Sequence, residues 1–355
     1  MKKKVIILFS TSYIAGAEKN LLKLGSANNT NNKNIDYYYF TMAKQEKLHY
    51  AFKNITNKYF SINTNLAIFR LFYILLQIIK NKFDVIYVCG FRASIYIRLF
   101  KFIFPKIKIV IAQRWNPNTS KLLDVLFRIS EFIINRITYK YIVNSYAAKM
   151  TLSKFINKSK IEVIYNGIDN FEPIYQPFKN KKYDICVIAN ISARKGHIEF
   201  IDVLKIIKSK LPSVRIVFVG KNNLGNVLNK IIIKSGLDKN IEILGYLDDV
   251  RQILSLSKLF VLPSKYGEGA PTSILEASIN RIPSIAYNID GVGEIIQHQK
   301  TGYLIDLKVN DIDKKIIHLL NDQNTNKDFG ENAYQHVQKS FKDEFFYSLH
   351  NQVFK

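Results

Sequence analysis

The sequence predicts an α/β protein built from two Rossmann-like, doubly wound lobes that face a cleft. Its 355 residues exceed one ordinary domain and suit two, each with its own hydrophobic core. Short apolar runs typical of strands alternate with helical runs, an order that produces a parallel sheet with helices on both faces. The alternation breaks around residues 166–182, which are rich in Asn, Gly, Pro and Lys, and then resumes.

The first lobe is expected to span residues 1–168, with a linker over 169–182. Its strands are predicted from apolar runs at Val5–Phe9, Tyr37–Thr41, Val85–Cys89, Ile107–Ala112, Tyr141–Asn144 and Ile161–Ile164. Its helices are predicted at Ala17–Gly25, Leu66–Lys80, Arg92–Phe104, Leu122–Ile137 and Ala147–Phe155. Doubly wound sheets bind ligands at the carboxyl ends of their strands, so the loops after these strands are candidate binding loops.

The second lobe is expected over residues 183–340. Its strands are predicted at Tyr183–Ala189, Val214–Gly220, Ile241–Leu244, Leu259–Leu262 and Ser284–Tyr287. Its helices are predicted at Gly196–Lys210, Asn226–Ser235, Val250–Ser255 and Thr272–Ile279. Residues 341–355 show apolar side chains at helical spacing and are expected to form a C-terminal helix that packs back on the body.

Composition and targeting signals point to a protein of the cytoplasm. Hydrophobic residues make up 48% of the chain and charged residues 23%, which is normal for a soluble globular protein. Cys89 and Cys186 lie in separate strand-like runs, which favours buried free thiols over a disulfide or a zinc site. The apolar run Val5–Phe9 is shorter than the roughly 7–15 residues of a signal-peptide core. Leu66–Ile79 falls short of the roughly 20 residues that span a bilayer.

The net charge of +24 is concentrated in the first half of the chain. Residues 1–175 carry 27 Lys and Arg against 9 Asp and Glu, a net +18, whereas residues 176–355 carry 25 against 19, a net +6. Such a field favours an anionic partner, whether membrane phospholipid, a pyrophosphate-linked lipid or nucleic acid. Charge alone does not choose among these partners.

The segment Leu259–Glu276 carries the clearest chemical pattern. A strand ends within it, and the following loop holds Glu268 between two glycines, whose missing side chains let the backbone approach a ligand. Pro271 suits the first position of the next helix, whose free N–H groups and positive dipole end form an anion site. Glu276 lies four residues after Thr272, on the same helix face. This spacing lets one carboxylate sit near a sugar and the second, about one turn deeper, near a ribose diol.

This segment resembles the Glu-x7-Glu motif of retaining family 4 glycosyltransferases, which have the two-lobed GT-B fold. Further matches to that family follow in order along the chain at Gly16-Ala17-Glu18, Val163–Asp169, Lys195-Gly196-His197, Val217–Gly220, Leu244-Gly245-Tyr246, Asp290–Glu294 and Thr301-Gly302-Tyr303. The first of these resembles the family's Gly-Gly-x-Glu loop, with Ala15 in place of one glycine. The resemblance covers nearly the whole chain.

The resemblance implies a donor site for a UDP-sugar or a GDP-sugar. Lys195 and Arg194 would neutralise the donor diphosphate, where charge builds up as the glycosidic bond breaks. Glu268 would contact the transferred sugar, and Glu276 would hold the ribose hydroxyls. The other implied donor contacts, several of them through backbone groups, are Gly16, Asn190, Gly245, Tyr246, Gly269, Ala270, Pro271 and Thr272.

The implied reaction is hexosyl transfer with retention of the anomeric configuration. In this family the leaving phosphate takes the proton from the acceptor hydroxyl while the protein stabilises an oxocarbenium-like state. Neither a hydrolase-type carboxylate pair, nor a cofactor, nor a metal ion is therefore expected. The one Asp-x-Asp, Asp311-Ile312-Asp313, follows Asn310 at an expected helix start, where acidic residues favour the helix dipole, and is assigned no metal.

Two positions depart from the family pattern. Many members carry an arginine shortly before the motif lysine, where this chain has Asn190, and Arg194 is the alternative cation. Many also carry a histidine near the acceptor, after the fourth strand of the first lobe, where this chain reads Gln113-Arg114-Trp115. Arg114 is then either an acceptor-side cation or an ordinary surface arginine.

The first lobe interleaves cations with aromatic residues between residues 69 and 108. The cations are Arg70, Lys80, Lys82, Arg92, Arg98, Lys101, Lys106 and Lys108, and the aromatic residues are Phe69, Phe72, Tyr73, Phe91, Tyr96, Phe100, Phe102 and Phe104. Arg98 and Lys101 are expected on one helix face, and such a surface suits attachment to an anionic membrane. The alternative is that the aromatic residues form core and the cations are merely solvated.

We therefore expect a peripheral protein on the inner face of the plasma membrane. Its expected acceptor is a saccharide, linked to a polyprenyl diphosphate, in the synthesis of a bacterial surface polysaccharide such as O-antigen, lipopolysaccharide or capsule. A GT-B-fold protein that binds a nucleotide-sugar without transferring it, or an epimerase of similar fold, would share these motifs. A nucleic-acid-binding protein would share the charge, but no recognisable binding motif is present and the clearest site is acidic, so no nucleic-acid partner is expected.

Overall fold

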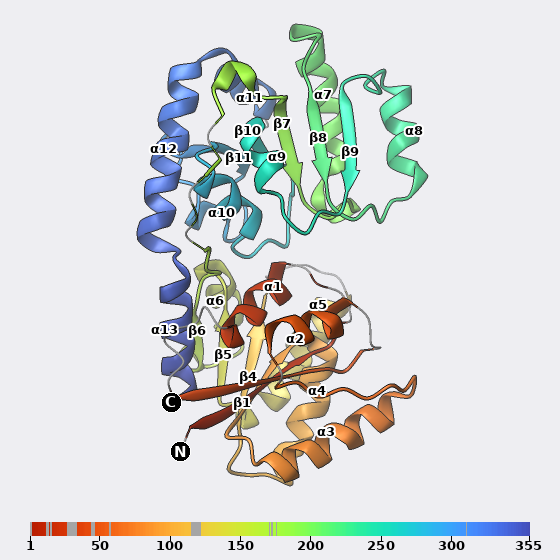
Figure 1. Ribbon diagram of the computed structural model, residues 1–355, viewed down its shortest axis with the longest axis vertical. Coiled ribbons are helices and arrows are strands. Elements are labelled where there is room, and N and C mark those ends of the chain that lie inside the picture. Colours follow the sequence, from red (N-terminus) through yellow and green to blue (C-terminus); the bar gives the residue numbers. More distant parts are fainter. Residues whose placement is uncertain are drawn as a thin grey trace. The chain divides into compact units, whose positions relative to one another are not determined.

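The computed structural model describes residues 2–11, 14, 16–26, 34–43, 47–56, 58–114, 122–169, 171, 173–174, 176–309 and 311–355. The chain divides into two compact units (Figure 1). The first unit combines Met1–Gly167 with Asp343–Lys355, and the second unit is Ile168–Lys342. Residues 169–182, expected as a linker, fall in the second unit.

The first unit contains a six-stranded parallel sheet in the order β2-β1-β3-β4-β5-β6. Its strands are β1 (Lys3–Phe9), β2 (Ile35–Thr41), β3 (Val85–Cys89), β4 (Lys108–Gln113), β5 (Lys140–Val143) and β6 (Ile161–Val163). The sequence predicted each of them to within a few residues. Prediction succeeded because strands covered on both faces read as continuous apolar runs.

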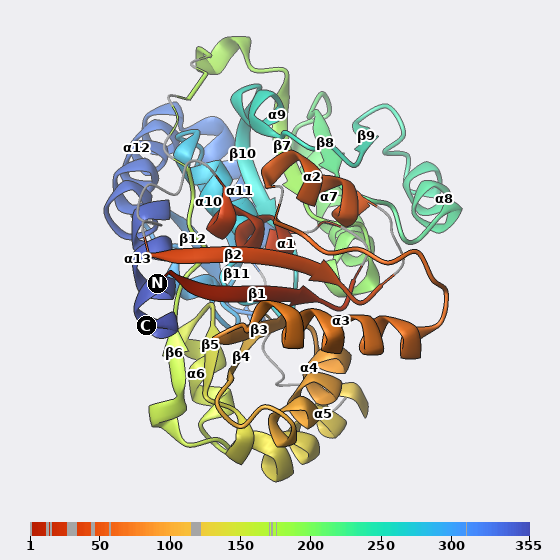
Figure 2. The same cartoon turned by 60° about the horizontal axis from the view of Figure 1, so that its bottom comes forward.

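Helices cover both faces of this first sheet. They are α1 (Gly16–Leu22), α2 (Lys47–Ile55), α3 (Ala67–Asn81), α4 (Phe91–Leu99), α5 (Leu122–Ile134), α6 (Tyr146–Leu152) and α13 (Asp343–Phe354), with 3-10 turns at Lys23–Gly25, Phe100–Phe102, Asn135–Ile137 and Lys158–Lys160. Leu21, Phe52 and Phe346 bring α1, α2 and α13 into one core. Ile74 and Ile97 bring α3 and α4 into a second core on the opposite face (Figure 2). The C-terminal helix thus packs back on the first unit, as predicted.

Two arginines of the expected cationic surface are buried in this unit. Arg98 of α4 forms an ion pair with Glu131 of α5, with NH1 2.8 Å from Oε1 and NH2 3.0 Å from Oε2. Tyr141 of β5 donates its hydroxyl to the same carboxylate. Arg70 of α3 donates to three main-chain carbonyls and is also buried. The prediction that Arg98 and Lys101 share a solvent-facing cationic surface is wrong, because Arg98 lies on the side of α4 that packs against α5 and the sheet.

The second unit repeats the architecture with a parallel sheet in the order β12-β11-β10-β7-β8-β9. Its strands are β7 (Tyr183–Ile188), β8 (Ile216–Val219), β9 (Ile241–Gly245), β10 (Ser257–Leu262), β11 (Ser284–Tyr287) and β12 (Gly302–Ile305). Its helices are α7 (His197–Lys210), α8 (Asn226–Lys234), α9 (Arg251–Ser255), α10 (Thr272–Ile279), α11 (Ile312–Asn321) and α12 (Gln323–Ser340), with 3-10 turns at Phe178–Asn180, Ala193–Lys195 and Val292–Glu294. The predicted two-lobed α/β fold is therefore confirmed.

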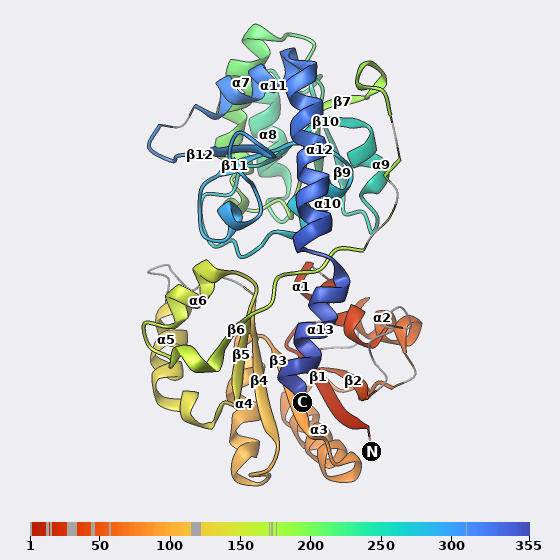
Figure 3. The same ribbon diagram turned by 90° about the vertical axis from the view of Figure 1, so that its left-hand side faces the viewer.

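Helix α12 was not expected from the sequence, because it lacks the usual apolar stripe. Its buried residues are Asn326, Gly330, Ala333 and Val337, a narrow row of small or polar side chains at helical spacing. A Cβ on Gly330 would lie 2.2 Å from the carbonyl oxygen of Arg281, so the two backbones approach closely there. The helix lies along α10 (Figure 3) and closes that side of the unit.

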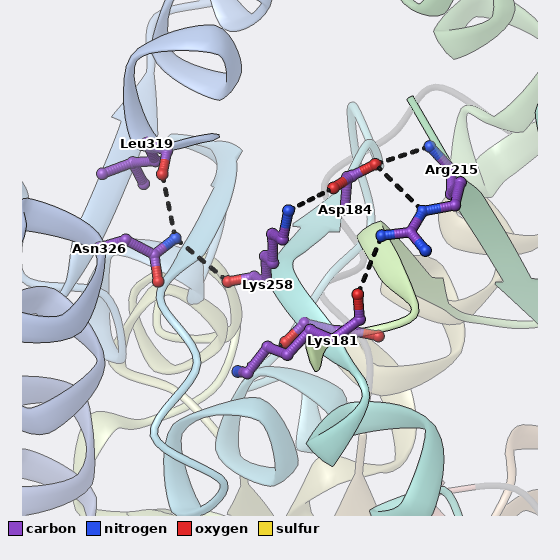
Figure 4. Close-up of polar contacts among 7 residues, drawn as sticks. Lys181, Asp184, Arg215, Lys258, Leu319 and Asn326 are labelled. Carbon is purple, nitrogen blue, oxygen red and sulfur yellow. Dashed lines mark hydrogen bonds and ion pairs between the residues drawn. The ribbon is translucent and has the colours of Figure 1, made fainter. Parts of the chain in front are cut away.

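A cluster of charged residues ties the amino ends of three strands in the second sheet (Figure 4). Asp184 of β7 accepts from Lys258 Nζ of β10 at 2.8 Å and from the backbone N–H of Arg215, next to β8, at 2.8 Å. Asn326 of α12 donates to the carbonyl of Lys258 at 3.1 Å. These contacts fix the edge of the sheet that lies opposite to the candidate binding loops.

Candidate active site

The strand order of the second sheet marks one place for a ligand. From β7 the chain moves outward through β8 to β9, and then crosses back to β10 on the other side of β7. The loops that follow β7 and β10 therefore leave the carboxyl edge of the sheet side by side, in opposite senses. Such a topological switch point is where open α/β sheets bind their ligands.

Gly196 shows how closely these two loops approach. Its φ is +73°, and a Cβ there would lie 2.1 Å from the carbonyl oxygen of Pro263, in the loop after β10. A side chain would therefore be strained by its backbone conformation and would also collide with the neighbouring loop. The glycine of the Lys-Gly turn lets the loop after β7 lie directly against the loop after β10.

Two cations and a carboxylate meet at this junction. Lys195 Nζ donates to Glu268 Oε1 at 2.6 Å, and Arg194 NH1 lies 3.7 Å from the same oxygen. Arg194 also donates to the carbonyl of Gly267 at 2.6 Å. Glu268 is 5% exposed, so the ion pair is almost shielded from water. The residues to which the sequence analysis gave catalytic roles thus form one cluster of two positive charges and one negative charge.

The environment keeps this carboxylate ionised. Burial alone raises the pKa of Glu268, but the charges of Lys195 and Arg194 outweigh it and hold the pKa below its usual value. For Lys195, burial lowers the pKa, Arg194 lowers it further and Glu268 opposes them. Glu268 alone does not neutralise both cations, so the side chains of Lys195, Arg194 and Glu268 together keep an excess positive charge suited to an anionic ligand.

Asp290 holds the Glu268 loop, a role that the sequence analysis missed. Its carboxylate Oδ2 accepts from the backbone N–H of Gly267 at 2.8 Å and of Glu268 at 3.0 Å. Asp290 follows β11 and has a φ of +45°, a conformation that Asp tolerates better than most side chains. The only sequence signal was its place in the Asp290–Glu294 landmark, which gave no indication that it contacts a loop 22 residues earlier.

His197 lies beside the cluster and is fully buried. Its ring contacts Phe218 edge-on at 5.3 Å between centroids. Neither ring nitrogen finds a hydrogen-bond partner among the described residues. Burial, helped by Lys195, lowers its pKa to about 4, so the imidazole is neutral at neutral pH. His197 therefore serves as a packing residue under the Lys-Gly turn.

The start of α10 follows Glu268 closely. Gly269, Ala270 and Pro271 are buried, and Thr272 begins the helix. Pro271 has φ −65° and ψ 119°, so it is the N-cap and not the first helical residue, one position earlier than expected. Because the ψ of Pro271 is extended, the helical conformation begins at the next residue, Thr272. Glu276 is half-buried on this helix, one turn after Thr272.

Glu276 and Tyr246 lie near each other at the same edge of the sheet. Burial raises the pKa of Tyr246 to about 12, with further contributions from a hydrogen bond to Asp248 and from the charge of Glu276. Tyr246 therefore stays a neutral phenol close to Glu276. Gly245, at the end of β9, has a φ of +71° and open space where a Cβ would stand, so the backbone there is accessible to a ligand.

Two predicted donor contacts have other surroundings. Asn190 is exposed, and its side-chain oxygen accepts from the backbone N–H of Lys221 at 3.2 Å, which joins the loops after β7 and β8. Gly16 is the first residue of α1 in the first unit, and its carbonyl accepts from Asn20 at 2.8 Å. Ala15, which replaces a family glycine, lies outside the described residues.

Arg114 directly follows β4 at the carboxyl edge of the first sheet. Its NH2 donates to the hydroxyl of Tyr87 at 3.1 Å, and its NH1 donates to Asn166 Oδ1 at 3.3 Å. Arg114 is thus a held and partly buried residue, unlike an ordinary surface arginine. Trp115 and Asn116, which follow it, lie outside the described residues.

Asp311 and Asp313 occupy a helix start, as the sequence suggested. Asp311 is the N-cap of α11 and lies 3.8 Å from Lys315, and Asp313 is in the first turn. Within the described ranges no three His, Cys, Asp or Glu side chains gather in a way that would hold a metal ion. Those ranges also contain no helix with the length and apolar character that crossing a membrane requires.

Comparison with known proteins shows which sequences and structures the chain resembles. Residues 170–336 match the family described as glycosyl transferases group 1. An Escherichia coli UDP-Gal:alpha-D-GlcNAc-diphosphoundecaprenol alpha-1,3-galactosyltransferase is 31% identical over 176 residues, 46% of this chain and 45% of that protein. A Staphylococcus aureus poly(ribitol-phosphate) alpha-N-acetylglucosaminyltransferase is 28% identical over 193 residues, 53% of this chain and 39% of that protein. The chain therefore spans about half the length of these curated relatives, or less.

Solved structures resemble the chain over nearly its whole length. Anabaena HepE in complex with UDP-glucose aligns with a TM-score of 0.85 at 18% identity, over 99% of this chain and 98% of that one. A glycosyltransferase from Rickettsia africae aligns with a TM-score of 0.82 at 18% identity, over 100% and 98%. At this identity the likeness establishes the GT-B fold. The group 1 match covers residues 170–336, less than half of the chain, so glycosyltransferase activity, family 4 and its Glu-x7-Glu motif stay predictions.

Proposed function

We propose that this protein is a retaining, metal-independent glycosyltransferase that moves a hexose from a UDP-sugar or GDP-sugar to a lipid-linked saccharide in bacterial surface polysaccharide synthesis. The observation that carries the proposal is the cluster of Arg194, Lys195 and Glu268 at the switch point of the second sheet. Its excess positive charge matches a diphosphate, and its carboxylate suits a sugar that gains positive charge as its bond to phosphate breaks.

The proposed chemistry uses the cluster in two ways. Arg194 and Lys195 stabilise the charge that develops on the leaving diphosphate. The bond between the anomeric carbon and the phosphate oxygen breaks, the acceptor oxygen bonds to the same face, and the acceptor proton passes to the leaving phosphate. Glu268 stabilises the oxocarbenium-like state, and Glu276 holds the ribose diol beside it. Asp290 keeps the Glu268 loop in position through two backbone N–H groups.

The proposed location is the cytoplasmic face of the plasma membrane, and an exposed apolar surface of the first unit supports it. Large apolar side chains of α3, of α4 with the turn after it, and of α5 are exposed; we call this surface the apolar face. Its residues are Ile68, Phe69, Phe72, Leu76, Ile79, Tyr96, Leu99, Phe102, Ile103, Leu122, Leu126, Ile129, Phe132 and Ile133. Exposed apolar patches of this kind are rare on proteins without a partner.

Charge favours an anionic bilayer as the partner of this face. The exposed cations Lys80, Lys82, Lys106 and Arg136 lie at or just beyond the C-terminal ends of the same segments. Among the side chains that the structure describes on α3, α4 and α5, the one carboxylate is Glu131, which is buried against Arg98. The described part of the face therefore offers apolar contact and positive charge without exposed negative charge, which suits the interface of an anionic membrane.

The acceptor proposal follows from the membrane surface and the relatives. The Escherichia coli relative acts, by its name, on a saccharide joined to diphosphoundecaprenol. A Staphylococcus aureus relative, CapH, is described as a capsular polysaccharide biosynthesis glycosyltransferase. A protein that docks on the bilayer meets such an acceptor where its lipid tail is embedded. We therefore propose a polyprenyl-diphosphate-linked saccharide as the acceptor.

Vesicle sedimentation tests the docking surface. The protein is expected to pellet with vesicles of phosphatidylglycerol and phosphatidylcholine at low salt, and less at high salt. Phe132→Glu should release it, because this side chain is 73% exposed on the apolar face. Ile233→Glu, at 66% exposure on α8 of the second unit, is the matched control and should pellet as the wild type does. Equal release by both variants, or no pelleting of the wild type, would refute the docking surface.

Transfer assays test the activity itself. The expected product keeps the anomeric configuration of the donor, read by NMR, and forms at the same rate with and without EDTA. Inversion, or loss of activity in EDTA, would refute the corresponding part of the proposal. Donor binding without transfer to any prenyl-diphosphate saccharide would instead indicate a nucleotide-sugar-binding protein.

A further inference from the structure

A continuous chain of hydrogen bonds links Arg114 to the C-terminal helix. Arg114 NH2 lies 3.1 Å from the hydroxyl of Tyr87 on β3, and that hydroxyl lies 3.1 Å from Nε2 of His350 on α13. His350 Nδ1 lies 2.8 Å from the carbonyl oxygen of Phe346, one helical turn earlier. On its other side, Arg114 NH1 binds Asn166 Oδ1. Residues separated by 263 positions in the sequence, Tyr87 and His350, thus act on one guanidinium.

The donors and acceptors in this chain allow only one direction. A carbonyl oxygen only accepts, so His350 Nδ1 carries the proton and donates to Phe346. In a neutral imidazole Nε2 then accepts, so the Tyr87 hydroxyl donates to it. The oxygen of Tyr87 keeps lone pairs that accept from Arg114. Each group therefore orients the next one, from the carbonyl of Phe346 through His350 and Tyr87 to the guanidinium of Arg114.

Burial keeps the chain in this single state. Tyr87 and His350 are fully buried. Burial and the charge of Arg114 lower the pKa of His350 to about 3, although the hydrogen bond to Phe346 raises it, so the imidazole stays neutral. Burial raises the pKa of Tyr87 to about 12 despite Arg114. Tyr87 and Asn166, which accept from Arg114, are thus neutral groups that leave its positive charge in place.

One donor of Arg114 remains without a partner. Its Nε is buried and has no hydrogen bond among the described residues, although an unpaired buried N–H is costly. Arg114 also stands at the carboxyl end of β4, the edge of a parallel sheet where ligands bind. An uncancelled charge, a free donor and a rigid mount together fit recognition of an anion.

We propose that Tyr87 and His350 are positioning residues that orient Arg114 toward a phosphate group, and that the C-terminal helix thereby contributes to acceptor recognition in the first unit. This inference rests on the proposed function for the identity of the phosphate, which is the diphosphate of the prenyl-linked acceptor. The donor diphosphate has the same chemistry, so the test below treats the two sources separately.

The test measures binding, so it does not depend on transfer activity. Calorimetry gives the Kd of farnesyl diphosphate, as a short prenyl-diphosphate probe, and of UDP for each intact variant. Tyr87→Phe removes the acceptor for Arg114, and His350→Leu removes the acceptor for Tyr87. Both should weaken farnesyl diphosphate binding by about tenfold and leave UDP binding within twofold of the wild type. His350→Gln, whose amide oxygen can accept from Tyr87, should restore most of the affinity.

Tyr347→Phe is the matched control, because it removes a buried hydroxyl of the same helix, bonded to Asp343, without touching the chain to Arg114. It should leave the Kd of both ligands unchanged, and circular dichroism checks that each variant is folded. The inference is overturned if folded Tyr87→Phe and His350→Leu bind farnesyl diphosphate as tightly as the wild type. It is also overturned if UDP affinity falls instead, since Arg114 would then serve the donor. Absence of transfer activity in the wild type would count against the proposed function alone.

Discussion

The two units share one architecture and differ in how each holds its charge. Both contain a six-stranded parallel sheet with candidate ligand groups at the carboxyl edge. In the second unit, Lys195 is in direct contact with the opposite charge of Glu268. In the first unit, Arg114 is held by neutral partners, Tyr87 and Asn166. A cation next to a carboxylate suits a ligand with both an anionic and a cation-like part, whereas a cation with neutral hydrogen-bond partners suits a simple anion.

The two units also differ in how many large apolar side chains they expose together on one surface. The first unit carries the apolar face on α3, α4 and α5. In the second unit the exposed large apolar residues are spread over several segments, among them Ile206, Val227, Ile233 and Val309. The net charge is also uneven along the chain, at +18 for residues 1–175 and +6 for residues 176–355. One scaffold therefore presents a cluster of charged side chains at the sheet edge in one unit and an exposed apolar surface in the other.

The largest expected effect is on the cluster of the second unit. Lys195→Met should lower the rate of transfer by about 10²–10³-fold, because it removes a donor that stabilises the leaving diphosphate. The rate constant kcat from steady-state kinetics measures it. Lys205→Met, an exposed lysine on α7 of the same unit, is the control and should keep the wild-type rate. A Lys195→Met variant with the wild-type kcat would show that Lys195 does not stabilise the leaving diphosphate, and the proposed difference between the two units would be wrong.

Acid is expected to destabilise both units, because each contains a neutral buried histidine. The pKa is lowered to about 3 for His350 and to about 4 for His197. Both imidazoles bind a proton near pH 6.5 when unfolded and not when folded, so the unfolded state binds more protons and stability falls as pH drops below 6.5. Between pH 7.5 and 5 each histidine should account for a loss of about 2 kcal/mol.

Urea unfolding at a series of pH values measures this loss. His350→Gln and His197→Gln should each flatten the acid dependence of the unit that contains the residue. A pH dependence that both variants share with the wild type would show that the two histidines are protonated in the folded protein.

A smaller effect is expected from the ribose contact. Glu276→Gln should weaken the binding of the preferred nucleotide by about tenfold, because a charge-assisted hydrogen bond becomes a neutral one. Calorimetric titration measures the Kd. Glu331→Gln, an exposed carboxylate on α12 of the same unit, serves as control. Unchanged affinity in Glu276→Gln would mean that the ribose lies elsewhere.

The smallest effect is expected at the loop support. Asp290→Asn keeps an oxygen that accepts from Gly267 and Glu268 but loses the charge, so kcat should fall about fivefold. Asp290→Ala leaves two backbone N–H groups without their acceptor, so kcat should fall further in this variant. If Asp290→Ala equals the wild type in rate, the loop holds its shape without the carboxylate.

The sequence predicted all the described parallel strands except β12, and most helices, because strands buried on both faces read as continuous apolar runs. It did not predict α12, whose buried row of Asn326, Gly330, Ala333 and Val337 lacks large apolar side chains. Arg98 was misjudged for a related reason. Residue spacing shows which side chains share a helix face. It does not show that Arg98 pairs with the buried Glu131, which lies 33 residues later in the sequence.

The candidate site divides in the same way. Lys195, Glu268 and Glu276 lie in short motifs with glycines and a proline around them, so local sequence singled them out. Asp290 supports Glu268 through backbone groups, which leave no trace in the sequence of the loop they hold. Tyr87 and His350 meet only because α13 returns to the first unit. Contacts that depend on tertiary packing are therefore the part that sequence alone did not reveal.

The proposed role of Lys195 and the residues around it is to hold a diphosphate. The most direct test compares the Kd of the tighter-binding nucleotide, UDP or GDP, with that of its nucleoside, in the wild type and in Lys195→Met. The diphosphate should tighten binding of the wild type at least tenfold, and most of this gain should disappear in Lys195→Met. If the variant keeps the full gain, the diphosphate does not lie against Lys195 and the account of the second unit is wrong.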